Sequence, residues 1–452
     1  MKKYLPILIL LVFFGCKKTE PETFADFISA VSIAPTDNAL RFKVNIDKKK
    51  DCTPVLEVRA KGTESWKAMP GRTAMFLYPE TEYEYRVCVG ELIGEVQSFT
   101  SGSIPEGVPT YQLVIDNGGP TEGYLLQMQP STPGYLTVCD MWGKVLWYEV
   151  FDDGIRCAQY DPKQGRMAVL EGFQEADSSS QIKQLRRAKH VYLIDWEGNR
   201  YLEWDASEET GKYPHHEIRL LPNGNIILNS GITKTFDLTA IGGTEDHPVC
   251  GDEIIELTQE KKIVFRWDVF QGLDLIADAS WLHTLEKAQD IVHQNSIDKD
   301  TDGNYYVTHH WTTEIWKIDG KTGTVLYKLG PHGNVTLDGE FANGGFHSIV
   351  VLEPDRFLVN NNGNTAKTPT HALVYKVDSQ SLTATIDMDV VCTTEYASTT
   401  GGNVELLPDG KTLYMNSTQS KSNIFMDKDG TILRVIKRPA TSYRAFYFPT
   451  LP

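Results

Sequence analysis

Residues 220–228 read LLPNGNIIL, two apolar runs on either side of a Pro-Asn-Gly-Asn turn. Asn-Gly between apolar runs predicts a tight β-hairpin, because both residues accept the backbone angles that such turns need. Four other segments have the same form: DPKQGRMAVL from Asp161, DTDGNYYVT from Asp300, LEPDRFLVN from Leu352 and LLPDGKTLY from Leu406. A hairpin that returns down the chain predicts a repeat protein.

A second hairpin ends each repeat, and an earlier copy precedes the first. These six segments are LTVCDMWGKVLWYEV from Leu136, VYLIDWEGNRYLEW from Val191, EIIELTQEKKIVFRW from Glu253, IWKIDGKTGTVLYKL from Ile315, LVYKVDSQSLTATI from Leu373 and IFMDKDGTILRVI from Ile424. Two hairpins make a four-stranded blade, so the pattern predicts an all-β, six-bladed β-propeller over residues 111–452. We expect the terminal YRAFYFPTL, from Tyr443, to add a strand that closes the ring against the first blade.

Residues 24–103 alternate apolar and polar side chains in short runs such as ALRFKVNI and YEYRVCVG, which predicts a small β-sandwich. The stretch LYPETEYEYRV, from Leu77, resembles the tyrosine corner of a fibronectin type III domain, with Tyr83 or Tyr85 as the corner residue. We expect this domain to be a spacer or a docking module, joined to the propeller by a short linker.

The first residues, MKKYLPILILLVFFGC, place two lysines before an apolar run that is too short to span a bilayer. The pattern predicts a signal peptide over residues 1–15. Its end resembles a bacterial lipobox, which implies lipidation of Cys16, a tether over residues 16–23 and a place in the bacterial cell envelope, facing the periplasm or the cell surface. A plain signal peptide with another cleavage site stays open. Of the later cysteines, Cys52 and Cys88 are the candidate disulfide pair.

A net charge of −16 without a Lys/Arg cluster argues against a nucleic-acid partner, because phosphate binding needs a concentrated basic surface. The sequence also has no Gly-rich phosphate loop before a helix and no cysteine spacing typical of zinc. We therefore predict no cofactor and no nucleotide donor. An anionic small molecule would be bound locally, by histidines and backbone N–H groups.

Three of the repeats carry a histidine at the head of the first hairpin. His216 and His347 stand eight residues before the turn positions Gly224 and Asp355, and His293 stands ten before Gly303, a difference explained if that turn is longer by two. The first strand of each blade lines the central channel of a propeller, so we expect the three side chains to converge at one mouth.

Each histidine alone is as well explained by a surface or hydrogen-bonded core position. Three at matched repeat positions favour a shared site. Metal ligation is another use of convergent histidines, and the pairs His215-His216 and His309-His310 keep it open. No carboxylate stands at ligand spacing beside them, so we predict no metal.

The segments HHEIRLLPNGNIIL, VHQNSIDKDTDGNYYV, TTEIWKID, FHSIVVL followed by NNNGN, and the late YRA together resemble the arylsulfate sulfotransferases of bacterial periplasms, from about Gly123 to the end. The resemblance implies transfer of a sulfuryl group from an aryl sulfate to a phenol through a sulfohistidine. It implies that His347 is the nucleophile and that His216 and His293 hold the sulfuryl oxygens.

Two positions depart from the family pattern. A Ser-Ser-Arg run reads Thr-His-His here, which puts His310 at the arginine position, and Gln-His-Asp reads Phe346-His347-Ser348. Histidine is not charged at every working pH as arginine is, so part of the anion clamp is replaced. Arg444 is the candidate substitute cation, and Trp311 and Phe346 are candidates to stack on an aromatic substrate.

Two other functions stay open. One is a surface lipoprotein that binds a ligand without chemistry, and the other is an aryl sulfate hydrolase in which water replaces the phenol. The natural donor, the acceptor and the oligomeric state are open as well, with a homodimer among the alternatives.

Overall fold

The computed structural model describes residues 22–172, 188–205, 214–277, 291–341, 344–363 and 368–451. The predicted signal peptide and Cys16 lie outside these residues. Almost every regular element in the described ranges is a strand, which confirms the all-β class. The helical elements are short: α1 (Phe24–Phe27), η1 (Thr239–Ile241), η2 (Val269–Gln271) and η5 (Thr394–Tyr396). No helix among the described residues is long and apolar enough to cross a membrane.

The chain divides into two compact units. The first contains the described residues through Ala34 together with Lys43–Ala74 and Glu82–Phe99, and the second contains Pro35–Phe42, Met75–Thr81 and the chain from Thr100 onward.

Two sheets form the first unit. One has the order β1 (Ile28–Pro35), β2 (Phe42–Lys48), β5 (Thr73–Ala74). The other has the order β4 (Lys67–Ala68), β3 (Val55–Ala60), β6 (Glu82–Val89), β7 (Leu92–Ile93), and β8 (Gln97–Thr100) also pairs with β6. Buried and exposed residues alternate along β2 and β6, so each sheet buries one face.

The structure bears on two predictions made for side chains of this unit, the tyrosine corner and the disulfide. The hydroxyl of Tyr85 donates to the side chain of Gln97 at 2.5 Å, rather than to backbone upstream as in a tyrosine corner. The predicted Cys52–Cys88 disulfide is wrong, because both are free thiols. Cys88 lies on β6, and its sulfur is 3.5 Å from a carboxylate oxygen of Glu57 on the neighbouring strand β3. Backbone pairing joins these two strands without a disulfide.

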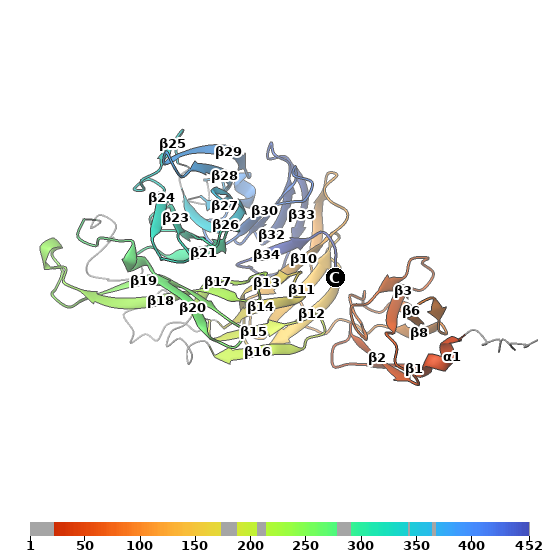
Figure 1. Ribbon diagram of the computed structural model, residues 1–452. Coiled ribbons are helices and arrows are strands. Elements are labelled where there is room, and N and C mark those ends of the chain that lie inside the picture. The colour runs from red at the N-terminus through yellow and green to blue at the C-terminus, as the bar shows by residue number, and fades with distance from the viewer. Residues whose placement is uncertain are drawn as a thin grey trace, which may run out of the picture. The chain divides into compact units, whose positions relative to one another are not determined.

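Six sheets, antiparallel except at one edge strand, form the described part of the second unit (Figure 1). The first four, in their strand order, are β12 (Val145–Phe151), β11 (Gly134–Asp140), β10 (Tyr124–Gln129), β34 (Ala445–Phe448); β13 (Ile155–Asp161), β14 (Arg166–Glu171), β15 (His190–Ile194), β16 (Arg200–Asp205); β17 (Pro214–Leu220), β18 (Ile226–Phe236), β19 (His247–Leu257), β20 (Ile263–Asp268); and β21 (Gln294–Lys299), β22 (Tyr305–His309), β23 (Glu314–Ile318), β24 (Val325–Leu329).

The last two sheets each carry a fifth strand. They are β25 (Thr336–Leu337), β29 (Thr383–Val391), β28 (His371–Asp378), β27 (Arg356–Asn362), β26 (Gly345–Glu353); and β30 (Asn403–Leu406), β31 (Leu413–Ser417), β32 (Ser422–Met426), β33 (Ile432–Lys437), β9 (Gln112–Asp116). All the hairpins predicted from the repeats are present, and β25 is the one strand here that pairs in parallel.

The first strands of successive sheets contact one another in a closed series, β13 to β17, β21, β26, β30 and then β34, with β10 returning to β13. The terminal strand β34 pairs with β10, so the predicted closure by the C-terminal segment is confirmed. In the other direction, β9 pairs with β33 of the last sheet. Early and late parts of the chain thus complete each other's sheets.

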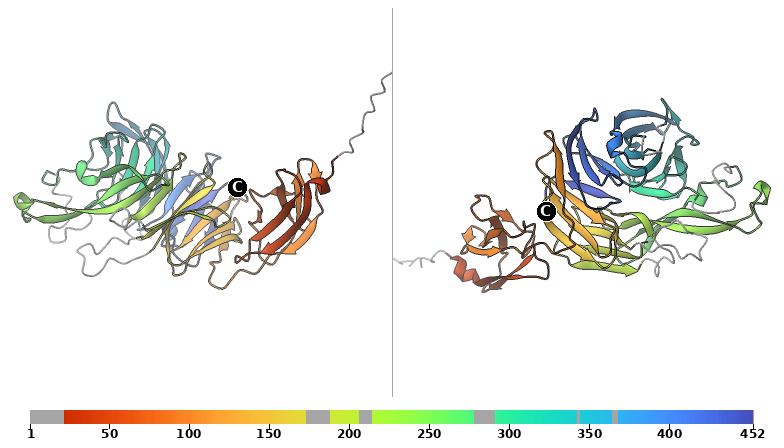
Figure 2. Two further views of the ribbon diagram at one scale, coloured as in Figure 1. Left: turned by 60° about the horizontal axis from the view of Figure 1, so that its bottom comes forward. Right: turned by 180° about the vertical axis from the view of Figure 1, so that it is seen from behind.

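The hairpin at residues 220–228 forms as its sequence indicates. Gly224 has φ of +87°, and its N–H donates to the carbonyl of Leu221 at 2.8 Å. Glycine is needed there because a Cβ disfavours positive φ. Figure 2 shows that the two middle strands of this sheet, β18 and β19, extend well beyond the neighbouring sheets.

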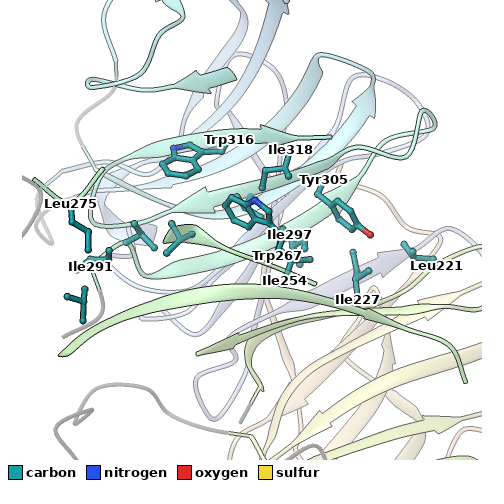
Figure 3. Packing of buried hydrophobic residues seen from close by; sticks show 14 of the residues in the cluster. Leu221, Ile227, Ile254, Trp267, Leu275, Ile291, Ile297, Tyr305, Trp316 and Ile318 are labelled. Carbon is teal, nitrogen blue, oxygen red and sulfur yellow. The ribbon is translucent and has the colours of Figure 1, made fainter. Parts of the chain in front are cut away.

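Apolar side chains pack in a cluster between the third and fourth sheets (Figure 3). Between the third and fourth sheets, Ile227, Ile254 and Trp267 pack against Tyr305 and Trp316, all at most 1% exposed. Each large side chain buried in this way stabilises the fold by about 1.5–3 kcal/mol. The first strands β13 and β17 are buried almost throughout, because neighbouring sheets cover both of their faces.

Candidate functional site

A cavity of about 430 Å³ opens where the first strands of the sheets begin. Its lining comes from residues far apart in the sequence: Pro130, Arg156, His216, His293, His310, Trp311, His347, Thr400, Gly401, Thr418, Thr441 and Tyr443. The four histidines proposed for chemistry and Trp311 therefore lie at one cavity.

The histidine rings follow one another around this cavity. The ring centroids of His216 and His293 are 4.8 Å apart, those of His293 and His310 5.8 Å, and those of His310 and His347 4.4 Å. A substrate group of a few atoms placed among them could reach several ring nitrogens at once.

Local backbone irregularities place these side chains. The strand register shifts at His216, between His215 and Ile218, and at His347, between Phe346 and Ser348. His216 also has a positive φ of 60°. A β-bulge re-aims a side chain that would otherwise follow the sheet, and such bulges are frequent beside active sites.

His293 reaches the cavity by a different route from the one predicted. The turn after β21 is not longer, because five residues separate the paired Lys299 and Tyr305, just as five separate Leu220 and Ile226. Asn295 therefore holds the register of His216. His293 lies two residues earlier with φ of 54°, and its carbonyl accepts the N–H of His310 at 3.1 Å.

Two of the histidines are held neutral. Burial, and then the charge of Arg156 and the neighbouring histidines, set the pKa of His216 well below its ordinary value. Burial also sets the pKa of His347 well below 6.5, followed by the effects of His310 and Arg444. An imidazole that stays neutral keeps a nitrogen lone pair for nucleophilic attack or proton transfer at neutral pH.

Arg156 is the functional candidate that the sequence analysis missed. Within the described part of the chain, it supplies the one guanidinium of the cavity lining. It lies in a bulge of β13, between Ile155 and Cys157, and is 6% exposed. Cys157 stands eight residues before Gly165, at the register of His216 before Gly224. The signal that could have found Arg156 is therefore an arginine one residue before the matched position.

Arg444 does not line the cavity. Its guanidinium is 1% exposed and donates to the carboxylate of Glu217 at 3.1 Å and to the carbonyl oxygens of Asn295 and Gly402 at 3.1 and 2.6 Å. It also donates to the carbonyl of His347. Arg444 therefore supports the backbone of His347 from beneath instead of facing the cavity, as substrate binding would require.

The two aromatic candidates, Trp311 and Phe346, lie in different environments. Trp311 is 42% exposed at the cavity, with its ring centroid 5.1 Å from that of His293 and 4.9 Å from that of His310. Phe346 is 1% exposed and belongs to the apolar core between the fourth and fifth sheets, where its ring meets Tyr375. The aromatic side chain that the sequence analysis did not select is Tyr443, which lies against His216 with a centroid distance of 5.3 Å.

The adjacent histidine pairs do not present both members to the cavity. His309 is buried, with its ring in a T-shaped contact with that of Trp316, and Nε2 of His215 lies 3.0 Å from a carboxylate oxygen of Asp252. Within the described ranges, no group of three His, Cys, Asp or Glu side chains is placed to hold a metal ion.

A family model described as arylsulfotransferase (ASST) matches residues 186–438. No curated protein matches the chain. Among solved structures, a Bacteroides caccae protein of unknown function is 14% identical with a TM-score of 0.46, covering 72% of this chain and 99% of its own. The periplasmic gluconolactonase PpgL of Pseudomonas aeruginosa is 9% identical with a TM-score of 0.40, covering 88% of this chain and 99% of its own.

Proposed function

This chain belongs to the arylsulfotransferase family, and we propose that it transfers a sulfuryl group from an aryl sulfate donor to a phenolic acceptor, without a nucleotide, through a sulfohistidine at His347. Membership suggests arylsulfotransferase activity in general. The observation that carries the finer proposal is the convergence of His216, His293, His310 and His347 on one cavity that also contains Arg156.

In the first half-reaction, a ring nitrogen of neutral His347 forms the N–S bond. The bond from sulfur to the aryl oxygen breaks, and its electron pair leaves with the aryloxide. Such transfer should resemble phosphoryl transfer, in which catalysis is mostly positioning and stabilisation of charge on the equatorial oxygens. His293, His310 and Arg156 surround the space where those oxygens would lie.

In the second half-reaction, a phenol loses its proton to a cavity histidine and its oxygen attacks sulfur. The S–N bond breaks, and its electron pair returns to His347. Donor and acceptor use the same cavity in turn, so the kinetics are ping-pong. Trp311 and Tyr443 offer aromatic faces to either ring.

The fold suits this proposal. We infer that the ring of six sheets is a six-bladed β-propeller over residues 111–452 and that residues 24–103 are a fibronectin type III-like sandwich. The support is the closed series of first strands and the pairing of β34 with β10 in the ring, and the sheet orders β1-β2-β5 and β4-β3-β6 in the sandwich.

We also propose that residues 1–15 are a signal peptide and that Cys16 is lipidated, so that the enzyme is anchored in the bacterial cell envelope. The supporting feature is the sequence MKKYLPILILLVFFGC. Metabolic labelling with an alkyne fatty acid should mark the wild-type protein but not Cys16→Ser. Equal labelling of both would reject the assignment.

Release of nitrophenolate from p-nitrophenyl sulfate tests the function, with and without phenol, in the wild type and in His347→Ala. The surface residue His371, which pairs with Asp389, provides the matched control His371→Ala. We expect phenol-dependent release that is lost only in His347→Ala. Release that needs no phenol would indicate a hydrolase, and no release from a folded protein would indicate a ligand-binding protein.

A further inference from the structure

A chain of polar contacts leads from the cavity into the protein behind His216. Nδ1 of His216 lies 2.7 Å from Nδ1 of His215, and Nε2 of His215 lies 3.0 Å from a carboxylate oxygen of Asp252. His215 is 1% exposed and Asp252 is fully buried on β19. Neither residue lines the cavity, so both act through His216 or not at all.

The other carboxylate oxygen of Asp252 has a separate partner. It accepts the backbone N–H of Gln294 at 2.6 Å. Gln294 directly follows His293, so one buried carboxylate contacts the residues next to two cavity histidines. Asp252 thus acts as a hydrogen-bond acceptor toward the backbone beside His293, while its other oxygen lies within ion-pair distance of His215.

The positions of the ring protons can be inferred from these contacts. An ionised carboxylate can only accept, so its closeness favours a hydrogen on Nε2 of His215, and the tautomer with that single ring hydrogen has its lone pair on Nδ1. Nδ1 of His216 must then donate to it. The nitrogen of His216 that remains for the cavity is Nε2, with its lone pair free to accept a proton.

We propose that Asp252 and His215 are positioning residues that hold His216 as the general base for the acceptor phenol. This deepens the proposed function and rests on it. It also assigns His216 a different task from the one that the family resemblance implies, since a lone pair on Nε2 cannot donate a hydrogen bond to a sulfuryl oxygen.

The proton has a defined path in this step. The phenolic O–H bond breaks as the O–S bond forms, and the proton moves to Nε2 of His216. The Nδ1 proton of His216 can then pass to Nδ1 of His215, where the resulting imidazolium is balanced by Asp252. The proton later leaves through Nε2 of His216, either to solvent or to the aryloxide released from the next donor. Charge balance in a buried site makes the base stronger than an isolated imidazole would be.

Asp252→Asn tests the relay. The amide oxygen should stay on the N–H of Gln294, which needs an acceptor, so the amide NH₂ would face His215. His215 would then carry its hydrogen on Nδ1 and donate to His216, whose Nε2 would become N–H. The tautomers of His215 and His216 are both inverted, while asparagine keeps the shape of aspartate. The analogous Asp→Asn change in a serine protease triad lowers the rate because it leaves the histidine in the wrong tautomer.

The two half-reactions separate this role from a structural one. With p-nitrophenyl sulfate, whose leaving group needs little protonation, the pre-steady-state burst of nitrophenolate should keep its rate and amplitude in Asp252→Asn. Steady-state turnover with phenol should fall about 100-fold, the lower end of what general base catalysis contributes. More acidic phenols should recover part of the loss, because they need less help to lose a proton.

The matched control is Asp389→Asn, which makes the same change at the His371–Asp389 contact of 2.8 Å on the protein surface. We expect wild-type kinetics from it. If Asp252→Asn lowers the burst and the turnover equally with every phenol, or leaves both unchanged, the proposal is wrong. A folded wild type that releases no nitrophenolate, with or without phenol, would instead overturn the proposed function.

A measurement on the wild type needs no variant to fold. With ¹⁵N-labelled histidine, the ring nitrogens of His216, assigned by comparison with His216→Gln, should report a protonated Nδ1 and an unprotonated Nε2. The opposite pattern, with the hydrogen on Nε2, would overturn the proposal whatever the kinetics.

Discussion

The guanidinium carbon of Arg156 lies 4.3 Å from the centre of the Tyr443 ring, and both side chains line the cavity. Arg156 comes from the second sheet of the ring, and Tyr443 directly precedes Arg444 and the closing strand β34. The stacking holds a permanently charged group at the cavity without neutralising it, because a ring face attracts a cation but carries no net charge.

Arg156→Met should raise KM for the aryl sulfate and lower kcat/KM about 10- to 100-fold, since a hydrogen bond to a charged group contributes about 1.5–3 kcal/mol. Steady-state kinetics on p-nitrophenyl sulfate at two salt concentrations measure the effect. Arg166→Met is the control, because Arg166 stacks on the exposed Tyr201 in the same sheet. An unchanged KM in Arg156→Met would remove Arg156 from the anion site.

His310→Arg should partly restore an enzyme that lacks Arg156. The His310 ring lies 4.4 Å from that of His347, so an arginine there would bring a fixed charge to the same sulfuryl oxygens. We expect the double variant Arg156→Met/His310→Arg to recover about tenfold in kcat/KM over Arg156→Met alone, within the 1.5–3 kcal/mol of a charged hydrogen bond. Simple addition of the two single effects would show that the two positions do not serve one group.

The buried neutral histidines should make stability fall in acid. The unfolded chain takes up a proton on each histidine near pH 6.5, whereas the pKa of His347 in the folded protein lies well below that value. The unfolded state therefore binds more protons below pH 6.5, and the free energy of unfolding falls by up to about 1.4 kcal/mol per pH unit for this group.

Urea unfolding between pH 8 and pH 5 checks this sign. His347→Gln should lose less stability than the wild type over the acid part of the range, while the two behave alike above pH 7. Parallel curves for the two proteins at every pH would mean that His347 is not held neutral by the fold.

Arg444→Met should destabilise the protein by about 3–5 kcal/mol, because Glu217 would remain buried without its cation. Chemical denaturation followed by tryptophan fluorescence measures this loss. Arg356→Met provides the comparison, because its ion pair with Asp387 is about one third exposed and should contribute less than about 1 kcal/mol. Equal effects in the two variants would contradict a central role for Arg444.

The hairpins were predictable because their determinants are local. Asn223 and Gly224 fix a turn between two apolar runs whatever surrounds them, and β17 and β18 form there. His216 and His347 were found for a related reason, since counting from a local turn places them at equivalent points of two repeats. The count was less successful for His293 and Arg156, because bulges and loops shift the backbone by one or two residues without a clear mark in the sequence.

The sequence by itself determined the all-β class, the hairpins and the histidines at matched repeat positions, because these depend on turns and periodicity within a few residues. Only the tertiary structure decided which side chains share the cavity. Closure of the ring brings Arg156 beside Tyr443, buries Phe346 in the core, and turns Arg444 toward Glu217. These outcomes depend on how distant strands pack and which polar groups need partners, and no local pattern contains that information.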